Sequence, residues 1–164
     1  MCRPDVFRAL VRATSLVVLA LVLAGCSAYS TVSKLWDVSA QTETVTLEAA
    51  PTVNEGYPVA VDLVAVSDPD FVDVIAEVEA GTWFKRRREF LNDRGNVLTV
   101  RSFELVPGQR RTDIGYGYLD RRTYHGIFVF ARYVRAGNHR ARLDPYSEPK
   151  VILGSDGIRV EAGS

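Results

Sequence analysis

Apolar and polar positions alternate through most of this chain, which is the pattern of β-strands that bury one face. In residues 43–47 the apolar side chains are Val45 and Leu47, two positions apart. Residues 59–66 (VAVDLVAV) alternate over a longer stretch, and residues 126–134 (GIFVFARYV) carry apolar side chains on both faces. A segment that is apolar on both faces predicts a strand in the interior of a sheet.

Shorter alternating segments and turn signals complete the predicted set of strands. The additional strands are expected over residues 97–105, 110–118, 150–153 and 157–161. Pro107-Gly108 and the run Gly154-Ser155-Asp156-Gly157 separate neighbouring strands as turns. Six or seven strands with one helical excursion predict a mainly β fold, a two-sheet β-sandwich with a short helical insertion.

The helical insertion is predicted by a change of period after residue 67. Asp68 can cap a helix and Pro69 suits its first turn. The apolar face of this helix is expected to hold Phe71, Val74, Ile75 and Val78, and Gly81 is expected to end or interrupt it. Residues 83–91 (WFKRRREFL) predict a second short helix with Trp83, Phe84, Phe90 and Leu91 on its buried side.

Together the strands and the helix predict one hydrophobic core. Its members are expected to be Val45, Leu47, Val59, Val61, Leu63, Phe71, Ile75, Val78, Phe103, Ile127, Val129 and Phe130.

The N-terminal residues have the pattern of a secretory signal peptide. Arg3, Arg8 and Arg12 precede an apolar run over residues 15–23, which is too short to cross a bilayer as a helix. The run ends in Leu-Ala-Gly-Cys at Cys26, which resembles the lipobox of bacterial lipoproteins. An ordinary signal peptide that happens to end near a cysteine is the alternative interpretation.

The lipobox implies a covalent membrane anchor. Residues 1–25 would be removed and Cys26 would carry fatty acyl chains such as palmitate, and two or more chains hold a protein stably on a membrane. In lipoproteins, Asp directly after the lipidated Cys commonly retains the protein at the inner membrane. Residue 27 is Ser, so the chain resembles lipoproteins that are sorted to the outer membrane, and the domain is expected on the periplasmic face. Residues 26–42, rich in Ser and Thr, are interpreted as a lipidated tether, and residues 43–164 as the β-sandwich domain.

Composition narrows the classes of function. The chain has 20 basic and 20 acidic residues, so a strong field for nucleic acid is not expected. Cys2 leaves with the signal peptide and Cys26 carries lipid, so we expect no disulfide and no cofactor other than the lipid.

Candidate catalytic and metal-binding groups are few. His125 and His139 show no ligand spacing with each other or with a cysteine, and structural or surface roles are favoured. Asp68 and Asp70 are explained as helix-capping residues. We therefore predict no enzyme, no metal site and no small-molecule substrate.

One dense charge run, Lys85-Arg86-Arg87-Arg88, admits two interpretations. It is either the solvated face of a short helix, offset by Glu89 and Asp93, or a surface for anionic lipid head groups or an acidic partner. The solvated face is favoured.

The order of elements behind the lipobox resembles the outer-membrane lipoprotein of type VI secretion systems, the TssJ/VasD family. The resemblance spans residues 43–161 and rests on Asn54, the segment 57–63 with Tyr57-Pro58-Val59, and Phe71. It also rests on the segments 105–109 (LVPGQ) and 124–133 (YHGIFVFARY). Two departures are Gln109, where the family often has an acid, and His139-Arg140-Ala141-Arg142 before the final strands.

The resemblance implies a transthyretin-like β-sandwich and a non-enzymatic role. A member of this family would tether the secretion membrane complex to the outer membrane by binding the periplasmic part of a TssM-like inner-membrane protein. The implied partner-binding site is the loop between the first two strands. In this chain that loop is Pro51, Thr52, Val53, Asn54, Glu55, Gly56 and Tyr57.

Val53 and Tyr57 are expected to be exposed side chains of this loop that offer apolar contact area to a partner. Another lipid-anchored sandwich stays open as an alternative, for example a peptide- or carbohydrate-binding module or an envelope assembly factor. A groove lined by aromatic residues away from the loop would favour that alternative.

Overall fold

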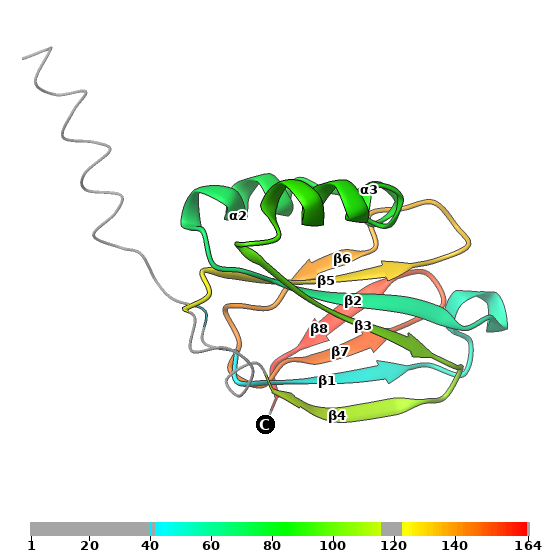
Figure 1. The fold of residues 1–164 in the computed structure, drawn as a ribbon. Coiled ribbons are helices and arrows are strands. Elements are labelled where there is room, and N and C mark those ends of the chain that lie inside the picture. Colours follow the sequence, from blue (N-terminus) through cyan, green and yellow to red (C-terminus); the bar gives the residue numbers. More distant parts are fainter. Residues whose placement is uncertain (1–39, 41, 116–122, 164) are drawn as a thin grey trace, which may run out of the picture. The chain divides into compact units, whose positions relative to one another are not determined.

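Two four-stranded sheets stack face to face, and two helices cover the outer face of one of them (Figure 1). The structure is a computed structural model that describes residue 40, residues 42–115 and residues 123–163. The predicted signal peptide, Cys26 and the tether up to residue 39 lie outside the described residues. Within the described residues, no helix has the length and apolar character that a membrane span requires.

The first sheet has the strand order β4-β1-β7-β8. Its strands are β4 (Arg110–Gly115), β1 (Thr44–Ala49), β7 (Lys150–Leu153) and β8 (Ile158–Glu161). β1 pairs antiparallel with β4 but parallel with β7, and β7 and β8 form a hairpin. The parallel pair brings the two ends of the domain sequence side by side at the centre of this sheet.

The second sheet has the order β3-β2-β5-β6 and is antiparallel throughout. Its strands are β3 (Leu98–Leu105), β2 (Val59–Val66), β5 (Gly126–Arg132) and β6 (Arg140–Arg142). β5 lies inside the sheet, as its two apolar faces predict. β6 was not predicted from the sequence, because its three residues carry no apolar alternation.

The core between the sheets is built by the inward faces of β1, β2, β5 and β7. One side of β2, with Val61, Leu63 and Ala65, points into this space together with Ile127 and Val129 of β5. All five side chains are fully or almost fully buried. The alternation read from residues 59–66 therefore assigns the correct side chains to this core.

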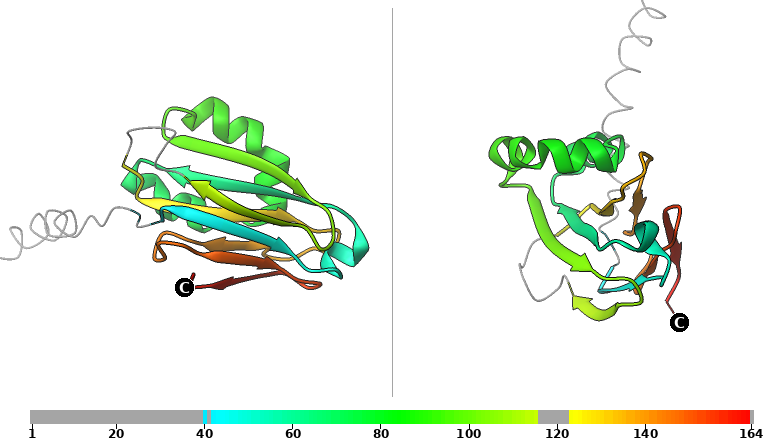
Figure 2. Two further views of the ribbon diagram at one scale, coloured as in Figure 1. Left: turned by 90° about the horizontal axis from the view of Figure 1, so that it is seen from below. Right: turned by 90° about the vertical axis from the view of Figure 1, so that its right-hand side faces the viewer.

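A second core lies between the second sheet and the helices α2 (Pro69–Ala76) and α3 (Ala80–Arg94) (Figure 2). Val64 and Phe130 contribute to it from the sheet, and Trp83 of α3 stacks on Phe130 with ring centroids 5.0 Å apart. The single predicted core is thus two cores on opposite faces of one sheet. Of the predicted members, Val78 and Phe103 are only partly buried.

The start of α2 is as predicted, and so are the buried positions of Phe71 and Ile75, but Val74 is not on the buried face. The Asp68 carboxylate accepts a hydrogen bond from the Asp70 backbone N–H, and Pro69 occupies the first turn. Val74 is exposed, whereas Val72 is buried against Gly126. A Cβ at residue 126 would come within 2.9 Å of a Val72 methyl, so the missing side chain of Gly126 makes room for Val72 rather than Val74.

The second helix is longer than predicted. α2 ends at Ala76, and Gly81, expected to end it, lies in the first turn of α3. Trp83 is fully buried, while Phe84, Phe90 and Leu91 are partly buried against the second core. A glycine near a helix start is tolerated because the first turn makes few intrahelical hydrogen bonds.

The domain has two distinct ends. The connections β1–β2, β3–β4, β5–β6 and β7–β8 lie at one end, and β1 and β5 begin at the other (Figure 1). The Ala40 N–H donates to the Tyr124 carbonyl oxygen at 2.6 Å, just before β5 begins. Thr42 is buried there and its hydroxyl lies 2.9 Å from the Leu143 carbonyl oxygen, so the packed domain includes residue 42.

Candidate partner-binding surface

The β1–β2 loop folds as a tight turn, η2 (Val53–Gly56), in which Asn54 and Glu55 have left-handed backbone angles. It lies at the end of the domain where β1 ends and β2 begins (Figure 1). Val53 is fully buried and packs into the core between the sheets. The prediction that Val53 is an exposed contact residue is therefore wrong. The loop turns back over the core, so the Val53 side chain closes the end of the core. The periodicity of the strands cannot indicate where a loop side chain will lie.

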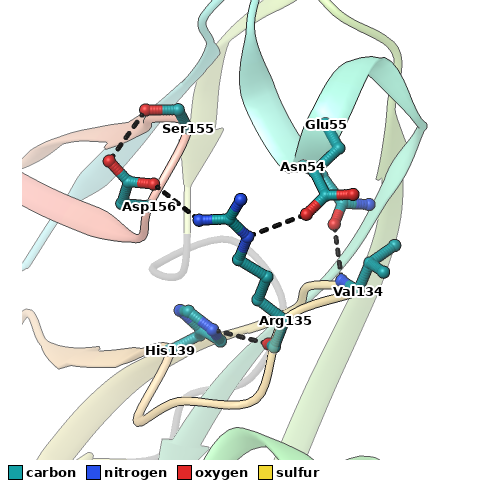
Figure 3. A network of polar contacts seen from close by, with 7 residues as sticks. All are labelled: Asn54, Glu55, Val134, Arg135, His139, Ser155 and Asp156. Carbon is teal, nitrogen blue, oxygen red and sulfur yellow. Dashed lines mark hydrogen bonds and ion pairs between the residues drawn. The ribbon is translucent and has the colours of Figure 1, made fainter.

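Asn54 holds the loop in place from inside. Its side chain is buried; Nδ2 donates to the Pro58 carbonyl oxygen at 2.9 Å and Oδ1 accepts from the Val134 N–H at 2.6 Å (Figure 3). Its backbone is left-handed, with φ 48° and ψ 42°, a conformation that Asn adopts more readily than most residues. Asn54 therefore supports the loop rather than offering its amide to a partner.

The next residue connects the loop to two other chain segments. Arg135, after β5, pairs through Nε with Glu55 Oε1 at 2.8 Å and lies 3.7 Å from Asp156 of the β7–β8 hairpin (Figure 3). All three side chains are exposed, and such ion pairs contribute about 0–1 kcal/mol each and weaken with salt. These ion pairs link the β1–β2, β5–β6 and β7–β8 connections but add little to the free energy of unfolding.

Tyr133 and His139 form the floor beneath Arg135. Their rings stack with centroids 4.3 Å apart, and His139 Nε2 lies 3.0 Å from the Arg135 carbonyl oxygen. The Tyr133 hydroxyl is 3.0 Å from the carbonyl oxygens of Gly154 and Gly157 and donates to one of them. Burial, with a smaller contribution from Asp156, raises the pKa of Tyr133 to about 12. His139 thus has the structural role favoured from the sequence.

Beside these ion pairs, the outward surface of this end carries exposed apolar side chains. Tyr57 is 60 % exposed and Val134 is 63 % exposed, and both line a groove of about 460 Å³. Val106, 51 % exposed, follows Leu105, which pairs with Val59, so the same register places Val106 beside Pro58. Three of the four large exposed apolar side chains in the described part of the chain thus belong to this end of the domain.

The residues of the predicted loop therefore differ in their exposure to solvent. Pro51, Thr52, Glu55, Gly56 and Tyr57 are exposed, whereas Val53 and Asn54 are buried. Val134 was not predicted as a contact residue, because the sequence placed it inside the strand expected over residues 126–134, whereas β5 ends at Arg132. An apolar residue at the end of a strand, where exposure to solvent is expected, is the sequence feature that could have indicated a contact role for Val134.

A second groove, of about 590 Å³, lies beside α3 and is lined by Lys85, Arg87 and Arg88 of the charge run. Arg87 bends toward the sheet and contacts the Asp62 carboxylate at 3.0 Å, while Trp83 Nε1 donates to the same carboxylate at 2.8 Å. Asp62 is 1 % exposed, so its charge is compensated inside the structure. The interpretation of residues 85–88 as a purely solvated face is wrong for Arg87 but holds for Arg86, which pairs with Glu89 at 2.7 Å.

Groups for chemistry do not gather at either groove. Among the described residues, no set of three His, Cys, Asp or Glu side chains is placed to hold a metal ion. Asp68 caps α2, as predicted. The arrangement at the loop end, an apolar rim on a rigid support, is suited to binding a macromolecule.

No protein-family model and no curated protein sequence matches the chain. Several solved structures share its fold. The crystal structure of the T6SS lipoprotein TssJ1 from Pseudomonas aeruginosa aligns with a TM-score of 0.56 and 22 % identity, covering 74 % of this chain and 95 % of that one. Lip of Serratia marcescens, a membrane-bound component of the type VI secretion system, aligns with a TM-score of 0.54 and 15 % identity, covering 77 % and 99 %.

A chain of a type VI membrane complex aligns similarly, with a TM-score of 0.55 and 16 % identity over 73 % of this chain and 98 % of that chain. These similarities confirm the predicted fold class, a two-sheet sandwich with a helical insertion, and the resemblance to the TssJ lipoproteins at the level of the fold. Almost the whole length of each compared chain is matched by this domain.

Proposed function

We propose that this protein is a lipid-anchored component of a type VI secretion membrane complex. It would tether the complex to the outer membrane by binding the periplasmic part of a TssM-like inner-membrane protein. The observation that carries the proposal is the fold shared with TssJ1 and Lip, behind a signal peptide that ends in Leu-Ala-Gly-Cys26.

Cys26 is the proposed anchor. Its lipid would hold the mature chain on the periplasmic face of the outer membrane, and residues 27–39 would join it to the end of the domain that contains Ala40. The connections of the opposite end would then be free to meet a partner. Anchoring at one end and partner binding at the other would let the domain bridge the outer membrane and an inner-membrane protein.

The partner-binding surface is proposed to be the exposed part of the β1–β2 loop together with Val134. Tyr57 and Val134 provide apolar contact area, and aromatic residues are common anchors of protein interfaces. Asn54 fixes the loop before binding, so less conformational entropy is lost when a partner docks. A buried polar clamp beneath an exposed apolar rim supports a preformed interface.

The test is capture of the periplasmic domain of a TssM-like inner-membrane protein from the same organism. Full-length lipoprotein in detergent micelles would be titrated with that domain by calorimetry. Tyr57→Ala with Val134→Asp should weaken binding by about 2 kcal/mol or more, roughly 30-fold. Because both side chains are more than half exposed, the melting temperature should change little.

Val74→Asp is the matched control, because Val74 is also an exposed valine but lies on α2. It should bind as the wild type does. Wild-type affinity in the folded double variant would place the interface elsewhere, and failure of the wild type to bind would reject the proposed partner.

A further inference from the structure

The helices cover only part of the outer face of the second sheet. Val64 and Phe130 lie under them, but the loop end of the same face presents Ala60, Glu104 and Arg132. Glu104 and Arg132 flank Ala60 on the neighbouring strands and are both exposed. This part of the face is polar, and α3 borders it through Phe84, Lys85 and Arg88.

The two grooves join on this surface. Ala60 and Arg132 line both the groove at Tyr57 and the groove beside α3. The chain segment from Tyr57 to Asp62 runs beneath both grooves in extended conformation. At the rise of a β-strand this segment is roughly 17 Å long. The joined groove has the length of about five extended residues.

The charges along the joined groove are unequal. Asp62 is paired with Arg87, and Glu89 is paired with Arg86, so both carboxylates are compensated. Within the described part of the chain, no carboxylate lies within ion-pair distance of Lys85, Arg88 or Arg132. These three cations and one carboxylate, that of Glu104, therefore remain, which gives the groove a net positive charge. Its end at Tyr57 is apolar.

We infer that this joined groove binds an extended acidic segment of the partner protein. An apolar residue of the segment would contact Tyr57 and Val134, and its carboxylates would pair with Arg132, Lys85 and Arg88. Guanidinium groups match the two oxygens of a carboxylate, and the complementary charge would also raise the rate of association. The inference rests on the proposed function and adds the chemistry of the bound segment.

A membrane surface is the less suitable occupant. The cations line a recess between α3 and the sheet, with Phe84 in its wall and Arg132 5.9 Å from the Phe84 ring centre. A flat layer of head groups would meet the rim of such a recess, whereas a single extended chain can enter it. Continuity with the apolar Tyr57 end also favours a peptide that has both apolar and acidic residues.

The probe is an acetylated, amidated octapeptide of two leucines followed by six glutamates. Full-length lipoprotein in micelles should bind it, and affinity should fall as salt screens the charges. Lys85→Glu with Arg88→Glu should weaken binding at least about tenfold. Arg110→Glu with Arg159→Glu is the control, because it changes net charge equally at two exposed residues of the first sheet that line neither groove.

Three results with the peptide would overturn the inference. They are no binding of the acidic peptide by the folded wild type, equal binding of a peptide with lysines in place of the glutamates, and an equal loss of affinity in the control variant. A membrane would instead be the occupant if the protein bound phosphatidylglycerol vesicles but not the acidic peptide, and if Lys85→Glu with Arg88→Glu abolished the vesicle binding.

Capture of the periplasmic partner domain separates this inference from the proposed function. If the wild type does not capture the domain, the proposed function fails, whatever the peptide does. If capture is lost with Tyr57→Ala and Val134→Asp but unchanged with Lys85→Glu and Arg88→Glu, only the groove inference fails. Weakening by both pairs of substitutions supports both.

Discussion

Asn54 shows how one buried amide determines the shape of a functional loop. Its side chain joins Pro58 to Val134, two residues that frame the apolar rim, and its backbone is left-handed. Both features belong to the same residue, so a substitution affects the loop and its support together.

Asn54→Ala should lower the free energy of unfolding by about 2–4 kcal/mol. The Val134 N–H would lose its acceptor at a cost of roughly 1–3 kcal/mol, and alanine adds about 1 kcal/mol in the left-handed region. Glu55→Gly is the comparison, because Glu55 has φ 59° but only a surface ion pair to lose. Urea unfolding would measure both, and equal stability of wild type and Asn54→Ala would contradict the clamp.

Tyr133 predicts a dependence of stability on alkaline pH. Its pKa is raised from 10.0 to about 12 by burial and by Asp156. The unfolded chain therefore releases this proton first, so the contribution of Tyr133 is complete below about pH 10 and is lost as pH rises toward about pH 12.

Tyr133→Phe should remove the part of the fall in stability that occurs in this window. Absorbance of phenolate in the folded protein should also lose its latest-titrating component in the variant. A variant that retains the full wild-type slope between about pH 10 and pH 12 would show that another group is responsible.

At the scale of elements, the two central strands of the second sheet contribute to both hydrophobic cores. β2 and β5 send alternate residues to the core between the sheets and to the core beneath the helices. Neither core is complete without these strands, so we expect both layers to unfold together.

Phe130→Ala should lower the free energy of unfolding by about 3–5 kcal/mol, because Phe130 is fully buried and stacks on Trp83. Phe103→Ala should cost less, because Phe103 is only partly buried. Thermal unfolding of the two full-length variants would compare them. A melting temperature for Phe130→Ala at or above that of Phe103→Ala would contradict the central place of β5.

At the scale of the whole molecule, anchoring and partner binding are proposed for opposite ends of the domain. Cys26 precedes the end that contains Ala40, and Tyr57 lies at the other. The two activities should therefore be separable by substitution.

In cells, Cys26→Ser should abolish labelling by a radioactive fatty acid and release the protein from outer-membrane fractions. The same protein should still capture the periplasmic partner domain after purification. Tyr57→Ala with Val134→Asp should have the opposite effect, with normal labelling and fractionation but without assembly of the membrane complex. Fatty-acid labelling of the Cys26→Ser variant would disprove the proposed lipid site.

The supports of the candidate site could be predicted only in part. Tyr57 was singled out correctly as an exposed aromatic residue, and Asn54 was recognised as part of the loop. The hydrogen bond from Val134 to Asn54 joins residues 80 positions apart, and the contact of Arg87 with Asp62 spans 25. Local periodicity contains no information about such pairs, because they depend on which strands become neighbours.

The sequence by itself determined the features that depend on neighbouring residues. Alternation defined both faces of β2 and the interior position of β5, Asp68-Pro69 began α2, and the 154–157 turn made the final hairpin. Each follows from side-chain direction or turn chemistry within a few residues. The tertiary structure alone decided that Val53 is buried, that Val72 rather than Val74 faces the sheet, and that Tyr57 and Val134 share one rim. These outcomes require the two sheets and the helices to be packed, because burial is a property of what lies opposite a side chain and not of the residue alone.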